Sequence, residues 1–179
     1  MAIKMIMAVD KHYGIGYKNR LPWKCKEDMQ FFKDQTDGLN NYVIMGRKTF
    51  ESMGSKPLSN RSNIIVTSKL KNTKDNLPDV YYFPFNEVKE MLKNAMGDCF
   101  IEHEWFDCKY YKDIYVIGGK SLYEGLIDYV DEILVTNIKG DYETDVKIDP
   151  KIFEDFEIEK KEYLSNKATV IYYKRKEGE

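Results

Sequence analysis

The sequence has little that would suggest a secreted, membrane-spanning or nucleic-acid-binding protein. Its 179 residues include only three cysteines. Such a sparse, odd set indicates no disulfide framework and fits a reducing cytoplasm. No apolar run approaches the ~18 residues of a membrane helix, and the apolar run within the first ten residues is too short and too early for a secretory signal. The 28 Lys and Arg and the 30 Asp and Glu give a net charge of −2, which excludes a strongly basic nucleic-acid binder.

Repeats and low-complexity segments are also missing, so we expect one globular domain over residues 1–179. Hydrophobic residues make up 42% and charged residues 32% of the chain, an ordinary balance for a globular protein. One excess stands out: aromatic residues reach 14%. They predict a rich core, a stacking surface or a pocket for a flat ligand.

Short apolar runs alternate with amphipathic segments along most of the chain. Nearly unbroken runs at 3–9, 41–45, 63–67, 113–117 and 132–136 predict buried strands. Residues 156–159 and 169–173 alternate more, as in an antiparallel pair, with a turn at 165–167. Helices are predicted at 26–35, 48–53, 86–96 and 121–127. This order predicts an α/β fold with a mainly parallel sheet and an antiparallel C-terminal edge, while residues 97–112 break the rhythm as an inserted loop.

Asp28 is the first candidate for chemistry. It shares a helix face with Phe31 and Phe32, where a carboxylate needs a partner. It is either an acid favoured by the helix dipole or the single acid of an apolar pocket that binds a cationic, amidine-like ligand. Before it, Gly14 and Gly16 begin a loop that is either a plain connection or an active-site lid. That loop lacks the last glycine of a dinucleotide fingerprint, so this match is rejected.

Three strand ends carry hydrogen-bond donors and cations. Residues 46–49 place a glycine, two cations and a hydroxyl after a buried strand. Residues 67–69 place two hydroxyls and a cation after another strand, and residues 118–121 place two glycines, a cation and a hydroxyl after a third. Together they predict an extended, phosphate-bearing cofactor across the carboxyl ends of the strands. In contrast, Cys99, His103 and Cys108 match no standard zinc spacing, so no metal site is expected. His12 is interpreted as a surface residue.

Several segments, taken in order, resemble the dihydrofolate reductase family. These are Ile6-Met7-Ala8, Gly14-Ile15-Gly16, Leu21-Pro22-Trp23, Asp28, Phe32, Thr36, the run from Val43 to Ser52, Arg61, residues 63–66, Ile117-Gly118-Gly119 and Tyr123. The combination of Leu-Pro-Trp, Asp28 and Met-Gly-Arg-Lys-Thr is specific, although no single piece is. The similarity runs from about Met1 to Asp149 and extends toward the end of the chain.

The resemblance implies NADPH-dependent reduction of 7,8-dihydrofolate to tetrahydrofolate, in one-carbon and thymidylate metabolism. The implied fold is one domain with a mostly parallel sheet of about eight strands and about four helices. Dihydrofolate and antifolate inhibitors are the implied partners of a cytoplasmic monomer, with no nucleic-acid or membrane partner and no metal.

The resemblance also implies roles for individual residues. Asp28 holds the 2-amino group and N3 of the pterin, Arg61 pairs with the glutamate α-carboxylate, and Thr136 supports the acid. A water near Leu21 and Trp23 protonates N5, with Asp28 tuning the ring. The other implied substrate-binding residues are Ile6, Met7, Phe32, Met53, Ile117 and Tyr123. The implied cofactor-binding residues are Ala8, Ile15, Gly16, Gly46, Arg47, Lys48, Thr49, Thr67, Ser68, Lys69, Gly118, Gly119, Lys120, Ser121 and Leu122.

Some positions depart from the family pattern. Ser59-Asn60 replaces a common Pro-Gly, Lys56 is an extra residue near Arg61, and Lys120 replaces a third glycine found in some members. The acidic position after the fifth strand aligns with Asp145. Three alternatives are weighed. Asp28 beside Phe32, together with Arg61, argues against a related pyrimidine reductase of riboflavin synthesis. A catalytically silent homologue would be kept for cofactor or protein contacts, with 97–112 as one place for them. A nucleic-acid patch at Arg47 and Lys48 is disfavoured by the net charge of −2. The aromatic excess supports a flat-ligand pocket only in part, because much of it lies elsewhere.

Overall fold

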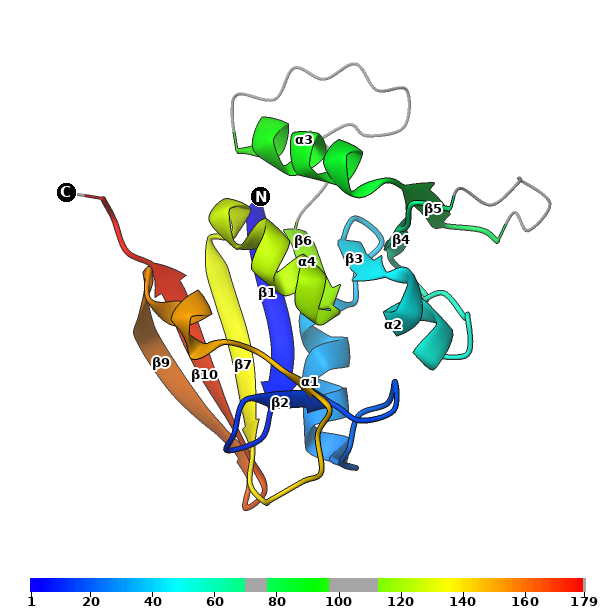
Figure 1. Ribbon diagram of the computed structural model, residues 1–179. Coiled ribbons are helices and arrows are strands. Elements are labelled where there is room, and N and C mark those ends of the chain that lie inside the picture. Colours follow the sequence, from blue (N-terminus) through cyan, green and yellow to red (C-terminus); the bar gives the residue numbers. More distant parts are fainter. Residues whose placement is uncertain (70–76, 97–112, 179) are drawn as a thin grey trace.

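An eight-stranded sheet organises the computed structural model, which describes residues 1–69, 77–96 and 113–178 (Figure 1). The strand order across it is β5-β4-β3-β6-β1-β7-β10-β9. Strands β1 to β7 of this sheet pair in parallel, and β10 pairs antiparallel with both β7 and β9. The strands are β1 Ala2–Val9, β3 Tyr42–Gly46, β4 Ser62–Val66, β5 Val80–Phe83, β6 Asp113–Gly118, β7 Glu132–Ile138, β9 Phe156–Ser165 and β10 Ala168–Arg175.

This topology confirms the expected α/β fold with an antiparallel C-terminal edge. The two-residue turn between β9 and β10 is the one predicted at 165–167. Two short elements were not predicted: β2 Gly14–Gly16 and β8 Val146–Lys147, which pair antiparallel in a separate ribbon. They are too short for a period-2 pattern. Strand β5 was also missed, because its four residues are all half-buried and show no alternation.

Helices cover both faces of the sheet. They are α1 Lys26–Thr36, α2 Arg47–Ser52, α3 Phe85–Ala95 and α4 Lys120–Leu126, with 3-10 turns at η1 Ile127–Tyr129 and η2 Pro150–Phe153. The odd-numbered residues of β1 pack with Leu92 of α3 and Leu126 of α4. Ile6 points to the opposite face, where Phe31 of α1 and Phe50 of α2 are buried. Because strands alternate their side chains, a nearly continuous apolar run serves both cores.

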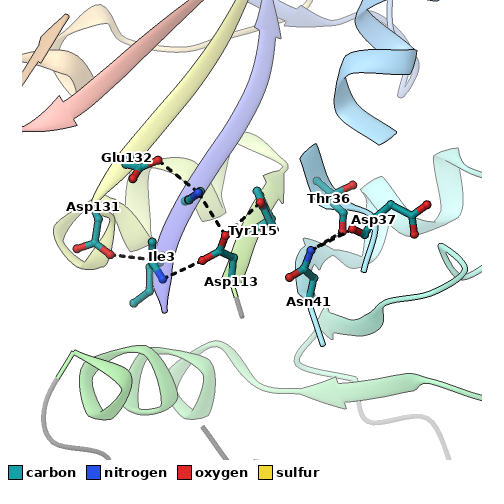
Figure 2. Close-up of polar contacts among 10 residues, drawn as sticks. Ile3, Thr36, Asp37, Asn41, Asp113, Tyr115, Asp131 and Glu132 are labelled. Carbon is teal, nitrogen blue, oxygen red and sulfur yellow. Dashed lines mark hydrogen bonds and ion pairs between the residues drawn. The ribbon is translucent and has the colours of Figure 1, made fainter. Parts of the chain in front are cut away.

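A polar network holds together the amino ends of the central strands, away from the glycine-bearing ends (Figure 2). The backbone N–H of Ile3 donates to Asp131 Oδ2 at 2.8 Å. Lys4 Nζ lies 3.3 Å from Asp113 Oδ2 and 3.5 Å from Glu132 Oε2. Burial raises the pKa of Tyr115, whose hydroxyl donates to Asp113, to about 12. These contacts tie β1 to β6 and β7, and leave the carboxyl ends free for ligands.

Two predictions fall outside the described residues. The expected inserted loop at 97–112 lies there, together with Cys99, His103 and Cys108. Where the structure does describe helices, none is long and apolar enough to cross a bilayer.

Candidate active site

A cleft of about 1430 Å³ opens at the carboxyl ends of the parallel strands. Four strands contribute residues at or near their carboxyl ends to its lining: β1 contributes Ala8, β3 Gly46, β4 Val66 and β6 Gly118. Parallel α/β sheets bind ligands at this edge because the loops there converge from neighbouring strands. The cleft exceeds the usual size of a pocket for one small ligand, about 300–1000 Å³. It therefore has room for a cofactor and a substrate together.

Most of the residues predicted for the site line this cleft. Loop residues and the first strand supply one wall, and the two glycine-bearing strand ends with their helices supply the other. The predicted residues found there are Ile6, Met7, Ala8, Ile15, Gly16, Leu21, Asp28, Phe32, Gly46, Arg47, Lys48, Thr49, Met53, Thr67, Ser68, Ile117, Gly118, Gly119, Lys120, Ser121, Leu122 and Tyr123.

Asp28 is the buried acid of the cleft. It lies in the first turn of α1 and is only 7% exposed. Burial raises the pKa of its carboxyl, and a hydrogen bond from the side chain of Thr136 partly opposes that rise. Thr136 on β7 is itself buried. Both readings of Asp28 therefore have support: it lies in the favourable first turn and it also faces a pocket. A desolvated carboxylate of this kind favours a ligand with an N–H pair or a positive charge.

Tyr123 closes the floor of the cleft. Its hydroxyl donates to the carbonyl oxygen of Ile6 at 2.9 Å, which links α4 to β1. Burial, and then the nearby charge of Asp28, raise the pKa of this phenol. Gly118 lies against it with φ +122°, and a Cβ there would come within 3.1 Å of the Tyr123 hydroxyl. A larger residue at position 118 would be strained and would crowd Tyr123.

The glycine-bearing ends of β3 and β6 lie side by side. A Cβ on Gly46 would sit 3.7 Å from the Gly119 nitrogen, and one on Gly119 would sit 3.5 Å from Thr49 Oγ1. Side chains at these positions would therefore occupy the space between the strand ends. Cations flank this gap: Arg47 pairs with Glu51 at 2.6 Å and Lys120 with Glu124 at 3.5 Å. Backbone, hydroxyls and cations together form a cradle suited to phosphates.

The glycine loop is braced from outside the cleft. The Asp10 carboxylate accepts from the backbone N–H groups of His12 and Gly14, both at 2.8 Å. Asp145 accepts from the Lys18 N–H at 2.9 Å, and its own N–H donates to the Gly16 carbonyl at 3.0 Å. The segment 14–20 is thus an ordered wall of the cleft, which favours an active-site role over a plain connection.

A second cavity of about 720 Å³ adjoins the first. Leu21, Asp28, Met29 and Phe32 line both. Arg61 lies in this second cavity and is buried; its Nη1 donates to Thr36 Oγ1 at 2.6 Å and its Nε to the Ser59 carbonyl at 2.9 Å. Burial lowers the pKa of the guanidinium. These two bonds fix the orientation of the arginine at the wall of this cavity.

Some predicted residues lie elsewhere. Trp23 lines the second cavity rather than the cleft, and its buried Nε1–H has no partner among the described residues. Thr136 lies behind Asp28 and does not line either cavity. Lys69 is exposed beside Thr67, to whose Oγ1 its N–H donates at 3.1 Å.

Several lining residues were not predicted. They are Asn19, Arg20, Met29, Ser52, Val66, Pro84, Phe85, Asn86, Glu124, Gly125 and Val146. Helix spacing could have found Met29, three residues before Phe32, and Gly125, four residues after Ser121. Pro84, Phe85 and Asn86 begin α3 after the unpredicted strand β5, so no signal in the sequence placed them at the cleft.

Comparison with known proteins gives a consistent result. The sequence profile described as dihydrofolate reductase matches residues 2–176. The chain is 31% identical to the dihydrofolate reductase of Ureaplasma parvum over 177 residues, covering 98% of this chain and 99% of that protein. It is 36% identical over 170 residues to the bifunctional dihydrofolate reductase-thymidylate synthase of Paramecium tetraurelia, covering 94% of this chain but only 32% of that protein.

A solved structure extends the likeness to the fold. Dihydrofolate reductase from Enterococcus faecalis, complexed with NADP(H) and RAB-propyl, superimposes with a TM-score of 0.78. The two chains are 27% identical, and the match covers 98% of this chain and 97% of that one. The similarity therefore spans the cleft, the second cavity and the antiparallel edge together.

Proposed function

Because the chain belongs to the dihydrofolate reductase family, it reduces dihydrofolate to tetrahydrofolate with NADPH, and we propose that the cleft and the adjoining cavity are where it does so. The observation that carries this assignment is the junction of the two cavities. Leu21, Asp28, Met29 and Phe32 line both. A flat ring held there by Asp28 meets the nicotinamide end of the cofactor on one side and extends its tail toward Arg61 on the other.

The substrate ring is held by a charge and by shape. The Asp28 carboxylate accepts two hydrogen bonds, from the 2-amino group and N3 of the pterin. Ile6, Phe32 and Ile117 supply apolar surface around the ring, with Met7, Met53 and Tyr123 completing the slot. Water is excluded from this side because Asp28 is 7% exposed and Ile6 is 4% exposed. Exclusion of water strengthens the contacts of Asp28 with its ligand.

The cofactor fits the cradle formed by the strand ends. Gly46 and Gly119 leave the gap that a diphosphate needs, and Thr49 lines it with a hydroxyl. We assign Arg47, Lys48, Thr67 and Ser68, which line the cleft, to the phosphates and the 2′-phosphate, while Lys69 lies exposed beside Thr67 outside the lining. Gly118, Lys120, Ser121 and Leu122 are assigned to the opposite side of the diphosphate. Ala8, Ile15 and Gly16 flank the nicotinamide. When bound, NADPH supplies the hydride for C6 of the pterin.

Protonation of N5 is assigned to water beside Leu21 and Trp23. Asp28 holds the far edge of the pterin and stabilises the ring electrostatically rather than delivering the proton itself. The buried Trp23 Nε1–H, without a partner in the described chain, supports this role because such a donor is normally satisfied by a bound water. Leu21, which is 49% exposed, leaves a path from solvent to that position.

Arg61 binds the α-carboxylate of the glutamate tail. A guanidinium offers two parallel N–H donors to a carboxylate, and the bonds from Arg61 to Thr36 and Ser59 fix its plane before the substrate arrives. The pterin end and the glutamate end are thus recognised by opposite charges in two adjoining cavities.

The test is direct turnover. Purified protein is mixed with NADPH and dihydrofolate, and the absorbance of the reduced nicotinamide is followed, with NADH as the matched control. We expect turnover that requires both reactants and prefers NADPH. Turnover no higher than the blank would overturn the proposed function and would favour a silent homologue.

We also propose that the chain works as a monomer in the cytoplasm. The sparse cysteines fit a reducing compartment. Its partners are small molecules rather than nucleic acid or a membrane. Antifolates with an amidine-like cationic ring would pair with Asp28 as the pterin does. Light scattering at working concentration, with NADPH present and absent, would contradict the proposal if it gave a dimer mass.

A further inference from the structure

We propose that Arg20 is an additional cofactor-binding residue, which contacts the diphosphate of the bound dinucleotide from the loop side of the cleft. Arg20 lines the large cleft but not the second cavity. The next residue, Leu21, lines both. Arg20 thus lies on the cofactor side of the junction, where the anionic groups of the proposed ligand pair are phosphates. The inference rests on the proposed function, since it needs the dinucleotide in this cleft.

The backbone fixes the position of Arg20. Tyr17 N–H donates to the Arg20 carbonyl at 2.9 Å, and Arg20 N–H donates back to the Tyr17 carbonyl at 3.0 Å. The residues between them, Lys18 and Asn19, have φ values of +48° and +59°. This is the geometry of a tight two-residue hairpin with both central residues in the left-handed region. The turn therefore fixes the backbone of Arg20 at the wall of the cleft, which Arg20 lines.

The loop is held in place by the segment 143–145. The Tyr17 hydroxyl donates to Glu143 Oε1 at 2.8 Å, and the Lys18 N–H donates to Asp145 Oδ2 at 2.9 Å. Inside the loop, a Cβ on Gly16 would lie 3.7 Å from the Arg20 carbonyl oxygen, so Arg20 is next to a residue assigned to the nicotinamide side. The backbone of Arg20 therefore lies beside the proposed nicotinamide end of the cleft, and the diphosphate is the phosphate group of the dinucleotide nearest to that end.

Arg20 also differs electrostatically from two other cations at the cleft, Arg47 and Lys120. Arg47 pairs with Glu51 and Lys120 with Glu124. Within the part of the chain that the structure describes, the Arg20 side chain forms no ion pair or hydrogen bond. An exposed guanidinium without a carboxylate is free to form bidentate bonds to a phosphate. Because the diphosphate is common to NADPH and NADH, Arg20 should serve both equally.

The experiment measures dissociation constants by quenching of tryptophan fluorescence. We expect R20A to weaken NADPH and NADH binding by the same factor, about five- to tenfold, and R20E to weaken both further. The difference should shrink at high salt, because the contact is at an exposed position. Binding of folate to the cofactor-free protein should not change. The matched control is K18A, a neighbouring cation on the same turn that does not line the cleft.

Several outcomes would overturn the inference. A loss confined to NADPH would place Arg20 at the 2′-phosphate, and a loss of folate affinity would assign it to the substrate. Equal losses in R20A and K18A would indicate general surface charge. If the original chain binds NADPH and R20A binds it equally well, this inference is wrong and the proposed function stands. If the original chain does not bind NADPH, the proposed function is wrong as well.

Discussion

Replacing Asp28 by Asn tests the central contact of the site. The change keeps size and shape but removes the charge from a side chain that is 7% exposed. Two hydrogen bonds from the pterin to a buried carboxylate are worth about 1.5–3 kcal/mol each. Asn can accept only one of them and presents a donor to the other. We therefore expect turnover at neutral pH to fall about 10²- to 10⁴-fold, which corresponds to about 3–5 kcal/mol of barrier.

The same variant should behave differently in stability. Burial raises the pKa of Asp28 above its ordinary 3.8, so the folded chain binds this proton more tightly than the unfolded chain. Stability from this group is present at low pH and is lost as the pH rises from 3.8 through the raised folded value. Asn does not ionise, so D28N avoids the cost of burying a charged carboxylate at neutral pH. Its free energy of unfolding at neutral pH should therefore equal or exceed that of the original chain.

The assay combines steady-state kinetics with urea unfolding monitored by fluorescence. D34N, an exposed position on the same helix, is the control and should leave turnover unchanged. A loss of turnover below about tenfold in D28N would show that the carboxylate is dispensable. A D28N protein that unfolds more readily at neutral pH would contradict the reading of Asp28 as a desolvated acid.

Three further substitutions test the other assigned contacts. R61L should raise KM for dihydrofolate more than it lowers kcat, because it removes binding to a part of the substrate that does not react; a pure kcat effect would move Arg61 to another role. T136V removes the hydrogen bond that lowers the pKa of Asp28, so the acid limb of the kcat/KM profile should move to higher pH, and an unmoved limb would refute the contact. R47A should weaken NADPH far more than NADH, because only NADPH has the 2′-phosphate; equal losses would contradict that placement.

Local sequence patterns determined most of the fold. Unbroken apolar runs predicted the buried parallel strands, because a central strand buries both faces. All four helices were predicted within one residue of their observed bounds. Apolar residues at three- and four-residue spacing distinguish a helix from a strand. Short or half-buried elements escaped this reasoning: β2, β8 and β5 carry too few residues or too little alternation to distinguish them from loops.

The chain by itself also determined the chemical types at the site, through Asp28, the strand-end glycines and Arg61, and a family resemblance gave them roles. Only the tertiary structure decided which of them share a space. It put Thr136 behind Asp28 from 108 residues away, separated Trp23 and Arg61 into a second cavity, and brought Phe85 and Arg20 to the cleft. Those placements depend on strand order and on the turn at 17–20, which pair residues distant in sequence. Local periodicity contains no information about such pairings, so they became visible only in the folded chain.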